Sequence, residues 1–574
     1  MSGSKNIYIF VIVSLLVTAV GYYGALEVPF YLDDRSSITH NVNFQNASIT
    51  SLFEAYGMRF VGYLTLWLNY MYAEEAVVSY HLVNVAIHLI NGFLVFGLTR
   101  KLLELSTLDI SENGTMLLSG LAALIFLSHP LNSQAVVYVV QRLASLVTMF
   151  YLGAVLLYLC ARTSSDAAKR NLYFGLCVLV SCLALFTKQN AVTIPFALVL
   201  IEVIVFRSIR LRYPLIFLTT IVVIFFTGLA FSGEGSVFHQ VDALTRESND
   251  ISRLEYLLVQ SSIITVYIQK FFLPMNLHLD YGLTLASFSS FQKVGALIVH
   301  LLILISALAF RNKTPLLSLG ILLFYTFHSV ESGFIPITDL AFEHRSYLPN
   351  FALVLCLVSV CGLVTSKKKI DSLVKAWFII PAAIVVLGLT GITHARVSEW
   401  KDPKIFYEKE LERSPNNVRT MHNFAEYLIR EGNLDNDKVK AGLLLDRMYE
   451  HSNGKLDGVM VNTHLVYLMG TKEYRKAAKL GESLLLQPLH PVTLSLVKEN
   501  LGVIFTTLGD YRKAITYFRT SHPLDNLKPS SRIAYAFALY KERKKKQALD
   551  VAESILVIDP NNSKAKELIA IIKS

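Results

Sequence analysis

Two neighbouring carboxylates, Asp33 and Asp34, lie a few residues beyond the first long apolar segment of this chain. Neighbouring acids repel each other, so the pKa of one is expected to rise and leave that group available as a base near neutral pH. A solvated pair of loop acids is the simpler alternative. Their position just outside a predicted membrane span favours a candidate acid–base site at the membrane surface, with both acids as catalytic candidates.

Three basic residues, Arg142, Lys188 and Arg345, lie at predicted outer ends of apolar segments. This runs against the usual excess of positive charge on the cytoplasmic side. A guanidinium can bind a phosphate through two parallel hydrogen bonds. An ion pair with Glu343, or contact with lipid head groups, is the alternative for Arg345. We take these three residues, with His344, as candidates for binding the phosphate of an anionic lipid-linked substrate.

Polar residues also recur at helical spacing within one apolar segment, at His81, Asn84, His88 and Asn91. Polar side chains in hydrocarbon usually face the interior of a helix bundle. No carboxylate or cysteine completes a metal-ligand set with the two histidines, so hydrogen bonding between helices is favoured over a metal site. The residues expected to line a cavity are His81, Asn84, His129, Asp280, Tyr281 and Glu343.

The composition places these residues in a membrane protein. Of 574 residues, 53% are hydrophobic and only 17% are charged, against about 25% charged in soluble proteins. The net charge of +10 comes from clusters in short connectors between apolar segments, which indicates membrane orientation and not nucleic-acid binding. The five cysteines all fall in predicted spans, which favours apolar packing and implies no disulfide framework.

The apolar segments predict an all-α membrane domain of about eleven spans. The first, about Asn6 to Leu26, has no cleavage site after it and is expected to be a retained signal-anchor. Ile251–Leu273 carries several charges and is interpreted as a re-entrant or interfacial helix on the outer side. The amino terminus is then cytoplasmic, and everything after Thr393 is outside. The other spans begin near Val77, Met116, Leu143, Leu172, Ala191, Pro214, Lys293, Pro315, Phe351 and Ala376.

From about Asp402 the sequence changes to charged, amphipathic helices. An alanine recurs in similar surroundings at residues 441, 477, 514 and 548, a spacing of about 34 to 37 residues. These units resemble tetratricopeptide repeats, which stack as helical pairs and can bind peptides on a concave face. A structural cap over the outer loops is the alternative. The predicted domains are therefore 1–398, a membrane catalytic domain, and 399–574, an α-solenoid.

The chain resembles the GT-C superfamily of glycosyltransferases that use polyprenyl-phosphate sugars. Within that superfamily it is most similar to the transmembrane and tetratricopeptide-repeat O-mannosyltransferases and related bacterial proteins. No Walker or Rossmann glycine motif suggests a nucleotide donor. Gln134 and Gln189 stand where relatives have acids. The motifs that carry the resemblance are Tyr31–Arg35, Tyr80–Asn84 with His88, His129–Val136, Gln141–Ala144, Thr187–Asn190 and Glu343–Arg345.

The resemblance implies an inverting transfer of a hexose from a polyprenyl-phosphate donor to Ser or Thr hydroxyls of exported proteins. Asp33 or Asp34 would take the hydroxyl proton, and Arg345, Arg142 and Lys188 would hold the leaving phosphate. No further cofactor is expected; a divalent cation is possible but not indicated. The implied partners are acceptor protein, held by the repeats, and membrane lipid. A bacterial inner membrane with a periplasmic catalytic face is expected, or an ER lumen in a eukaryote.

Two alternatives remain, one within enzymes and one from another class of function. The first is sugar transfer to a lipid or glycan, which would not need a peptide-binding arm. The second is a non-catalytic scaffold whose repeats recruit partners. Changing Asp33 and Asp34 to Asn separates them, because a scaffold should keep working while a transferase should lose turnover and keep its fold. A transporter fits less well, since the charges gather at one surface and not at the membrane midplane.

Overall fold

The computed structural model describes a chain made of helices and connecting loops, with no strand among the described residues. Two compact units are present, Met1–Arg413 and Ser414–Ser574. The all-α prediction, a helical membrane domain plus a helical solenoid, is confirmed. The described residues are 2–45, 47–208, 251–333, 335–366, 372–432, 435–452, 456, 458–486, 489 and 491–574.

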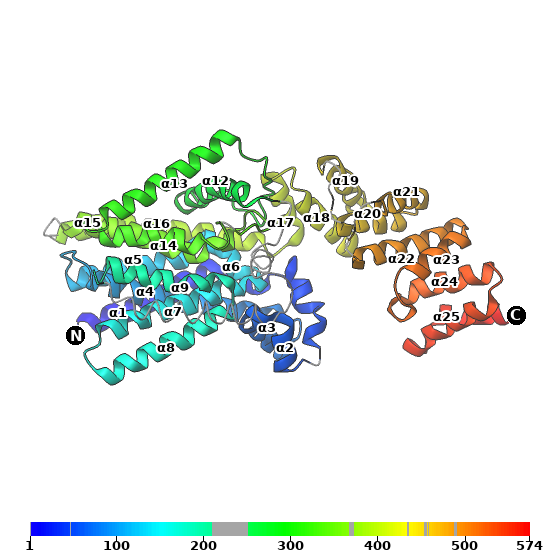
Figure 1. The fold of residues 1–574 in the computed structure, drawn as a ribbon, viewed down its shortest axis with the longest axis horizontal. Coiled ribbons are helices and arrows are strands. Elements are labelled where there is room, and N and C mark those ends of the chain that lie inside the picture. The colour runs from blue at the N-terminus through cyan, green and yellow to red at the C-terminus, as the bar shows by residue number, and fades with distance from the viewer. Residues whose placement is uncertain are drawn as a thin grey trace, which may run out of the picture. The chain divides into compact units, whose positions relative to one another are not determined.

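The first unit is a bundle in which the long apolar helices run side by side (Figure 1). Helix α7 packs extensively against α8 and α4, and α14 packs against α15. Pairs far apart in sequence also meet, because α1 lies against α16. The bounds of these helices are α1 Ser2–Tyr22, α4 Val77–Glu104, α5 Glu112–Ser128, α6 Ser133–Val137, α7 Arg142–Thr163, α8 Ala167–Leu185, α9 Ile194–Ile204, α13 Ser290–Phe310, α14 Pro315–His328, α15 Tyr347–Ser366 and α16 Ser372–Glu399.

Seven helices in the described part of the chain are long and apolar enough to cross a membrane, or eight if the bent pair α5–α6 is one span. Two shorter apolar helices, Gln189–Ile204 and Pro315–His328, coincide with spans predicted near Ala191 and Pro315. The span predicted near Pro214 lies outside the described residues. The number eleven therefore stays a prediction, while a membrane domain of several apolar helices is established.

The long connector after α1 folds into two helices, α2 (Ile49–Tyr56) and α3 (Phe60–Ala73). Helix α2 begins at a capping box formed by Ser48 and Ser51, which satisfies its first backbone N–H groups. Helix α12 (Arg253–Phe272) is not among the candidate spans. One face of α12 is buried with Leu340, and whether the segment is re-entrant stays a prediction.

The last helix of the first unit, α17 (Pro403–Arg413), follows α16 after a short turn. It contributes Phe406 to an aromatic cluster, with its ring 4.5 Å from that of Trp400 and 4.8 Å from that of Tyr31. Tyr31 also donates a hydrogen bond from its hydroxyl to the carbonyl of Trp400, at 2.7 Å. The loop after α1, which carries the paired acids, is therefore held against the end of α16.

The second unit is a solenoid of helical pairs (Figure 1). Small residues allow these helices to pack closely, as the repeat pattern predicts. A Cβ added at Gly502 would lie 2.7 Å from the Phe518 ring, and one at Gly481 would lie 2.6 Å from Leu501. The helices from α20 to α26 share one apolar core. Their bounds are α18 Val418–Glu431, α19 Asp435–His451, α20 Gly458–Gly470, α21 Tyr474–Leu484, α22 Pro491–Leu508, α23 Tyr511–Thr520, α24 Pro529–Lys541, α25 Lys545–Ile558 and α26 Ser563–Lys573.

Candidate active site

The paired acids after α1 occupy different environments. Asp34 is 1% exposed, and its two carboxylate oxygens accept backbone N–H groups of Tyr31 at 3.1 Å and Val140 at 2.7 Å. The side chain of Asp33 is exposed, and its backbone N–H donates to the hydroxyl of Tyr138 at 3.0 Å. Asp34 therefore fixes the loop, while the carboxylate of Asp33 is exposed and interacts with the Tyr138 hydroxyl.

Burial raises the pKa of the Asp34 carboxyl to about 8, although the N–H groups of Val140 and Tyr31 oppose the rise. The charge of Asp33 adds only the smallest contribution. Repulsion between the two acids, which the sequence suggested as the cause, is therefore secondary to desolvation.

This raised pKa makes stability depend on pH. A carboxyl whose pKa is higher in the folded than in the unfolded chain stabilises the fold most below its unfolded pKa, and the contribution is lost as pH rises through about 8. The pKa of His278 is lowered by burial to about 3, so its contribution no longer changes above its unfolded value near 6.5. The window above pH 6.5 therefore isolates Asp34 from His278.

We expect the free energy of unfolding of the detergent-solubilised protein to fall by about 2 kcal/mol between pH 6.5 and 8 through Asp34 alone. The Asp34→Asn variant should be less stable overall, because the amide cannot accept both N–H groups, but its stability should change less over the same window. Thermal unfolding of both proteins at several pH values measures the difference. If the stability of both proteins changed with pH in the same way, the pH dependence could not be assigned to the Asp34 carboxyl.

Three of the four predicted phosphate-binding residues come together around Glu331, which follows α14. Lys188 Nζ lies 2.6 Å from Glu331 Oε1, and Asn190 donates to Glu331 Oε2 at 2.8 Å. Arg345 and His344 interact electrostatically with the same carboxylate. Arg59 also interacts electrostatically with Lys188, and we call Arg59, Lys188 and Arg345, with the adjacent His344, the cation cluster.

Neighbouring positive charges keep the buried carboxyl of Glu331 ionised. Burial favours the neutral acid, but Lys188 and Arg345 outweigh burial and hold the pKa of Glu331 at about 2. Burial lowers the pKa of Lys188, and the charge of Glu331 opposes that effect. The pair is therefore ionised, and Arg345 also interacts with Asp339. Three cations (Arg59, Lys188 and Arg345) and two carboxylates (Glu331 and Asp339) give this cluster a formal charge of +1.

Arg59 was not predicted from the sequence. It is exposed at the start of α3 and interacts electrostatically with Lys188. The backbone N–H of Val61 donates to the carbonyl of Phe186 at 2.8 Å, which holds the start of α3 beside the end of α8. Arg59 lies within the long connector after α1 and not at the end of an apolar segment, so the signal that identified Lys188 and Arg345 does not apply to it.

Arg142 is the predicted phosphate ligand that the structure places elsewhere. It is fully buried, and its guanidinium donates to Asn84 Oδ1 at 2.6 Å and to Asn69 Oδ1 at 2.6 Å. It also donates to the carbonyls of Thr65 and Tyr80, both at 3.0 Å. Each of its three nitrogens has a partner from α3 or α4, so Arg142 joins these helices to α7.

The polar face of α4 forms hydrogen bonds between helices. His81 Nε2 lies 2.8 Å from the carbonyl of Val28, and Asn84 donates to the carbonyls of Val136 and Val139 at 3.0 and 3.3 Å. His88 Nδ1 lies 2.6 Å from the hydroxyl of Tyr347. This is the interhelical bonding that the spacing favoured. Within the described residues no group of three or more metal-ligating side chains occurs.

One buried segment, Ser133–Gln141, connects the acids to the cation cluster. Gln134 accepts the backbone N–H of His344 at 2.8 Å, while Tyr138 holds the backbone of Asp33. Val140, two residues further on, binds Asp34. Residues 134 and 138 are one helical turn apart, about 6 Å. The two parts of the candidate site are therefore attached to the same short element.

The contacts of Gln134 explain why a glutamine, and not the expected acid, occupies this position. Its amide oxygen binds His344, and its amide nitrogen donates to the carbonyl of Leu279 at 2.7 Å. An ionised acid at this position could not donate the second bond. Gln189, the other departure, is exposed.

We expect Gln134→Glu to destabilise the protein by about 1–3 kcal/mol, because it leaves the buried carbonyl of Leu279 without a donor and adds a buried charge. Gln189→Glu makes the same chemical change at an exposed position and should stay within about 0.5 kcal/mol of the wild type. Thermal unfolding of both variants checks this. Equal losses of stability in the two variants would show that the hydrogen bonds of Gln134 to His344 and Leu279 do not stabilise the protein.

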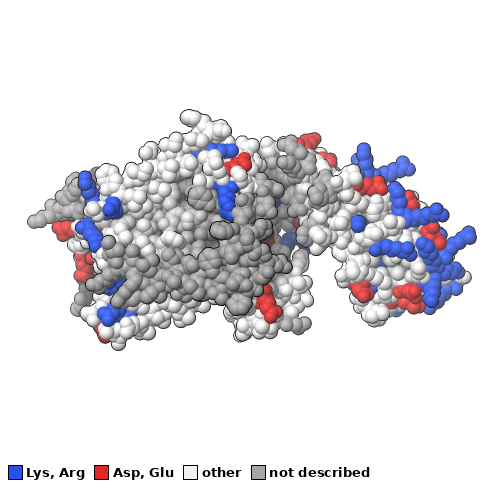
Figure 2. Space-filling model, viewed as in Figure 1, with Lys and Arg blue, Asp and Glu red and all other residues white. Residues whose placement is uncertain are grey.

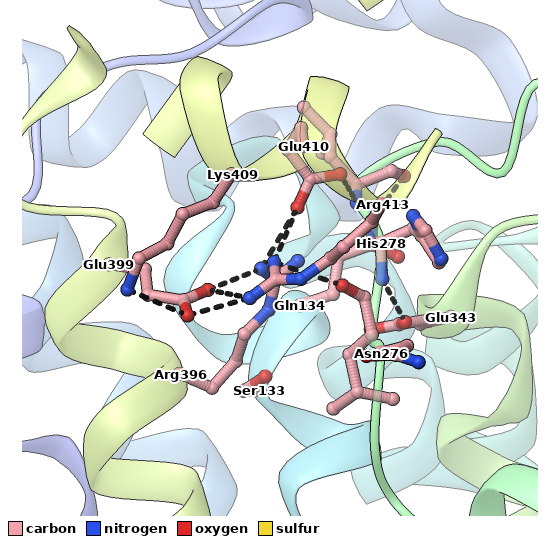
Figure 3. Close-up of polar contacts among 12 residues, drawn as sticks. Ser133, Gln134, Asn276, His278, Glu343, Arg396, Glu399, Lys409, Glu410 and Arg413 are labelled. Atoms are coloured by element: carbon pink, nitrogen blue, oxygen red, sulfur yellow. Dashed lines mark hydrogen bonds and ion pairs between the residues drawn. The ribbon is translucent and has the colours of Figure 1, made fainter. Parts of the chain in front are cut away.

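Glu343 belongs to a buried network of charges at the end of α16 (Figure 3). Its Oε1 accepts the backbone N–H of His278 at 2.6 Å and the hydroxyl of Tyr281 at 3.0 Å. Arg396 donates to Glu399 and to Glu410, both at 2.9 Å. Arg396 and Glu399, and Glu410 and Arg413, are opposite charges three residues apart, a signal that the sequence analysis did not use.

The network joins α17 to the loop before α13. Glu410 Oε2 accepts the N–H of Leu279 at 2.7 Å, and Arg413 donates to Glu399 at 2.7 Å (Figure 3). Within the described residues, Glu343 Oε2 and two nitrogens of Arg396 have no hydrogen-bond partner. Because Glu343 directly precedes His344 and Arg345, this network supports the short helix that carries part of the cation cluster.

The remaining predicted residues lie in turns. Asp280 accepts the N–H of Gly282 at 2.8 Å, within the loop that Glu343 holds. His129 Nε2 lies 2.8 Å from the carbonyl of Phe271, and its ring stacks on that residue at 4.8 Å. Tyr281 reaches Glu343, as described above. His129 and Tyr281 thus join separate parts of the chain, and Asp280 stabilises its own turn.

With this geometry established, the chain was compared with known proteins. No family model and no solved structure matches it. It is similar to Protein O-mannosyl-transferase F38B6.6 of Caenorhabditis elegans, with 26% identity over 470 residues, 78% of this chain and 64% of that protein. It is also similar to Protein O-mannosyl-transferase TMTC3 of Mus musculus, with 27% identity over 244 residues, 39% of this chain and 24% of that protein.

The human Protein O-mannosyl-transferase TMTC3 shows 26% identity over 196 residues, 31% of this chain and 20% of that protein. The chain thus spans less than two thirds of the length of these relatives. The likeness supports the O-mannosyltransferase branch of the resemblance and a glycosyltransferase that modifies proteins.

Proposed function

We propose that this chain is a membrane glycosyltransferase that moves a hexose, mannose by analogy with its relatives, from polyprenyl phosphate to Ser or Thr hydroxyls of exported proteins. The proposal rests mainly on one observation. An exposed carboxylate, Asp33, and a net-positive cation cluster are both hydrogen-bonded to the same buried segment, Ser133–Gln141. The similarity to proteins named O-mannosyl-transferases supports the same reaction.

The charge of the cluster suits the proposed donor. A sugar linked to a lipid through one phosphate carries a single negative charge on a phosphodiester, and the cluster retains one positive charge. Arg345 can provide two parallel N–H donors, and Lys188 provides a point charge. When the sugar leaves, the lipid phosphate gains a second negative charge. Fixed cations in a buried site stabilise that developing charge, which lowers the barrier to transfer.

Asp33 is the better candidate for the base. Both oxygens of Asp34 already accept N–H groups, whereas the carboxylate of Asp33 is exposed. In the proposed step the acceptor hydroxyl oxygen forms a bond to the anomeric carbon as the bond from that carbon to the phosphate oxygen breaks. Asp33 takes the hydroxyl proton, and the lipid phosphate keeps the electron pair. Attack from the side opposite the phosphate inverts the anomeric centre.

Arg142 takes no part in binding the donor in this proposal, because its nitrogens are engaged with α3 and α4. Its charge lies close enough to interact electrostatically with Asp34. Its proposed role is to hold the segment after Tyr138 against α4, so that Asp33 and the cation cluster keep their positions.

The active face and the repeats are proposed to lie outside the cytoplasm, in a periplasm or an ER lumen. A knockout of the gene, compared with its parent by mass spectrometry of exported proteins, tests the function. Loss of a hexose from particular Ser or Thr peptides supports it. Loss of sugar from a lipid or glycan with unchanged proteins would identify the other acceptor class, and unchanged sugars throughout would favour a scaffold.

A further inference from the structure

The turns that join the two helices of successive repeats in the second unit carry an unusual concentration of positive charge. The first turn precedes α21, the second precedes α23 and the third precedes α25. We call their exposed cations the basic strip, and Figure 2 shows Lys and Arg side chains gathered over this unit. The strip consists of Lys472, Arg475–Lys476, Arg512–Lys513 and Arg543–Lys546.

The three turns occupy equivalent positions in successive repeats, and ion pairs join the second turn to the repeats on either side. Lys513 lies 3.2 Å from Glu482 of the preceding repeat, and Arg512 lies 3.3 Å from Glu542 of the following one. The cations of successive turns therefore form a row, and do not point to unrelated sides of the unit.

The backbone conformation of these turns indicates that the cations do not stabilise the fold. Equivalent positions two residues before the second helix are Lys472, Gly509 and Arg543, and all three have positive φ, at 64°, 85° and 61°. Glycine adopts this conformation without steric cost, while other residues are strained. Two repeats thus place a cation where glycine would be more stable.

The helix starts are also unfavourable for positive charge. The amino-terminal end of a helix carries partial positive charge, so Asp and Glu are stabilising in its first turn and cations are not. Helices α21, α23 and α25 have no acid in their first turn. Before α25 the usual capping acid is replaced by Lys544, which makes no capping hydrogen bond.

Few carboxylates compensate the strip. Glu473 pairs with Lys476, and the two contacts between repeats pair Arg512 and Lys513. Among the residues that the structure describes, no ion pair is made by Lys472, Arg475 or the cations of Arg543–Lys546. Their charge is therefore available to a partner.

From this geometry we propose that the basic strip binds an extended acidic segment of a protein partner. An extended chain can run along this row with its acidic side chains opposite successive turns. Surfaces that bind lipid bilayers usually add exposed apolar side chains to their positive charge. Between residues 470–480, 508–514 and 541–548 the described structure exposes one large apolar side chain, Leu508, at 40%. A polypeptide is thus favoured over a membrane surface.

The test uses the full-length protein in nanodiscs of neutral lipid and a fluorescent peptide of repeated Glu-Gly-Gly triplets. No sugar donor is present, so the result does not depend on the proposed transferase activity. Lys544→Gln, Lys545→Gln and Lys546→Gln together should weaken binding by about tenfold and flatten its salt dependence. The matched control, Lys564→Gln, Lys566→Gln and Lys573→Gln, removes the same charge from α26 and should bind like the wild type.

A second variant separates binding from folding. Lys472→Gly with Arg543→Gly removes two cations and relieves both strained positions, so it should unfold at a higher temperature and bind the peptide more weakly. Equal losses in the strip and control variants would overturn the proposal. So would failure of the wild type to bind the acidic peptide more tightly than a Gln-Gly-Gly peptide. Binding only to vesicles that contain phosphatidylserine would assign the strip to a membrane instead.

Discussion

The Asp33→Asn variant is expected to lose sugar transfer by about 10²–10⁴-fold in kcat, because the amide cannot take the proton of the acceptor hydroxyl. The fold should be little changed, since the side chain of Asp33 is exposed, its backbone N–H still donates to Tyr138, and the new amide oxygen can still accept from the Tyr138 hydroxyl. Binding of the donor should also remain, because the cation cluster is unchanged. The measurement is transfer from synthetic polyprenyl-phosphate mannose to a Ser/Thr peptide at saturating donor.

Glu54→Gln is the matched control for this variant. Glu54 is an exposed acid on α2, in the same connector as Asp33, and its change should leave kcat within about threefold of the wild type. Asp33→Glu should recover part of the activity, because a carboxylate is restored with a longer reach. If Asp33→Asn turned over at the wild-type rate, the base would lie elsewhere and the proposed step would be wrong.

The second large effect is expected at the cation cluster. Arg345→Lys keeps the charge but loses the two-pronged guanidinium, so donor binding should weaken by about 10- to 100-fold, seen as a higher KM for the donor. Arg345→Lys is preferred to removal of the cation, because Glu331 would otherwise keep a buried negative charge with fewer partners. Free polyprenyl phosphate, which competes with the donor, should also become a weaker inhibitor by a similar factor.

Lys401→Arg is the matched control. Lys401 is a half-exposed cation at the end of α16 that pairs with Glu27 at 2.9 Å, and it lies outside the cation cluster. This conservative exchange should leave KM unchanged. Thermal unfolding of Arg345→Lys must stay close to the wild type for its KM to be interpreted. A folded Arg345→Lys variant with an unchanged KM and a lowered kcat would show that Arg345 does not bind the donor before the reaction.

The sequence predicted the cation cluster because Lys188 and Arg345 share a visible property, a positive charge at the outer end of an apolar segment. Arg142 has the same property and a different role. Its partners, Thr65 and Asn69, come from α3, in a connector that the sequence presented only as a long loop. Position along a span indicates which side of the membrane a cation faces, but not whether its donors are already satisfied.

Glu331 and Arg59 were missed for a related reason. Neither belongs to a motif, and their importance comes from contacts with Lys188, a residue far away in sequence. The helical spacing of His81, Asn84 and His88 predicted a buried polar face on α4, because such periodicity is local. By contrast, Asp34 is buried and Asp33 is exposed because Asp34 binds the backbone N–H of Val140. Residue spacing does not show this contact.

The fold followed from composition and repeats more fully than the site did. Long apolar helices and small residues at crossings, such as Gly502 against Phe518, are encoded locally. The charge network of Glu343, Arg396 and Glu410 is not, because it joins three separate parts of the chain (Figure 3). Predicting it would have required knowing that α17 returns to the loop before α13.

The most direct test of the account is a structure of the protein bound to a phosphonate analogue of polyprenyl-phosphate mannose, in which the sugar cannot leave. The phosphonate is expected against Arg345 and Lys188, with the anomeric carbon facing the carboxylate of Asp33 across a space that admits a hydroxyl. A phosphonate bound away from Arg345, or an Asp33 carboxylate turned away from the sugar with no path to it, would contradict the proposed reaction.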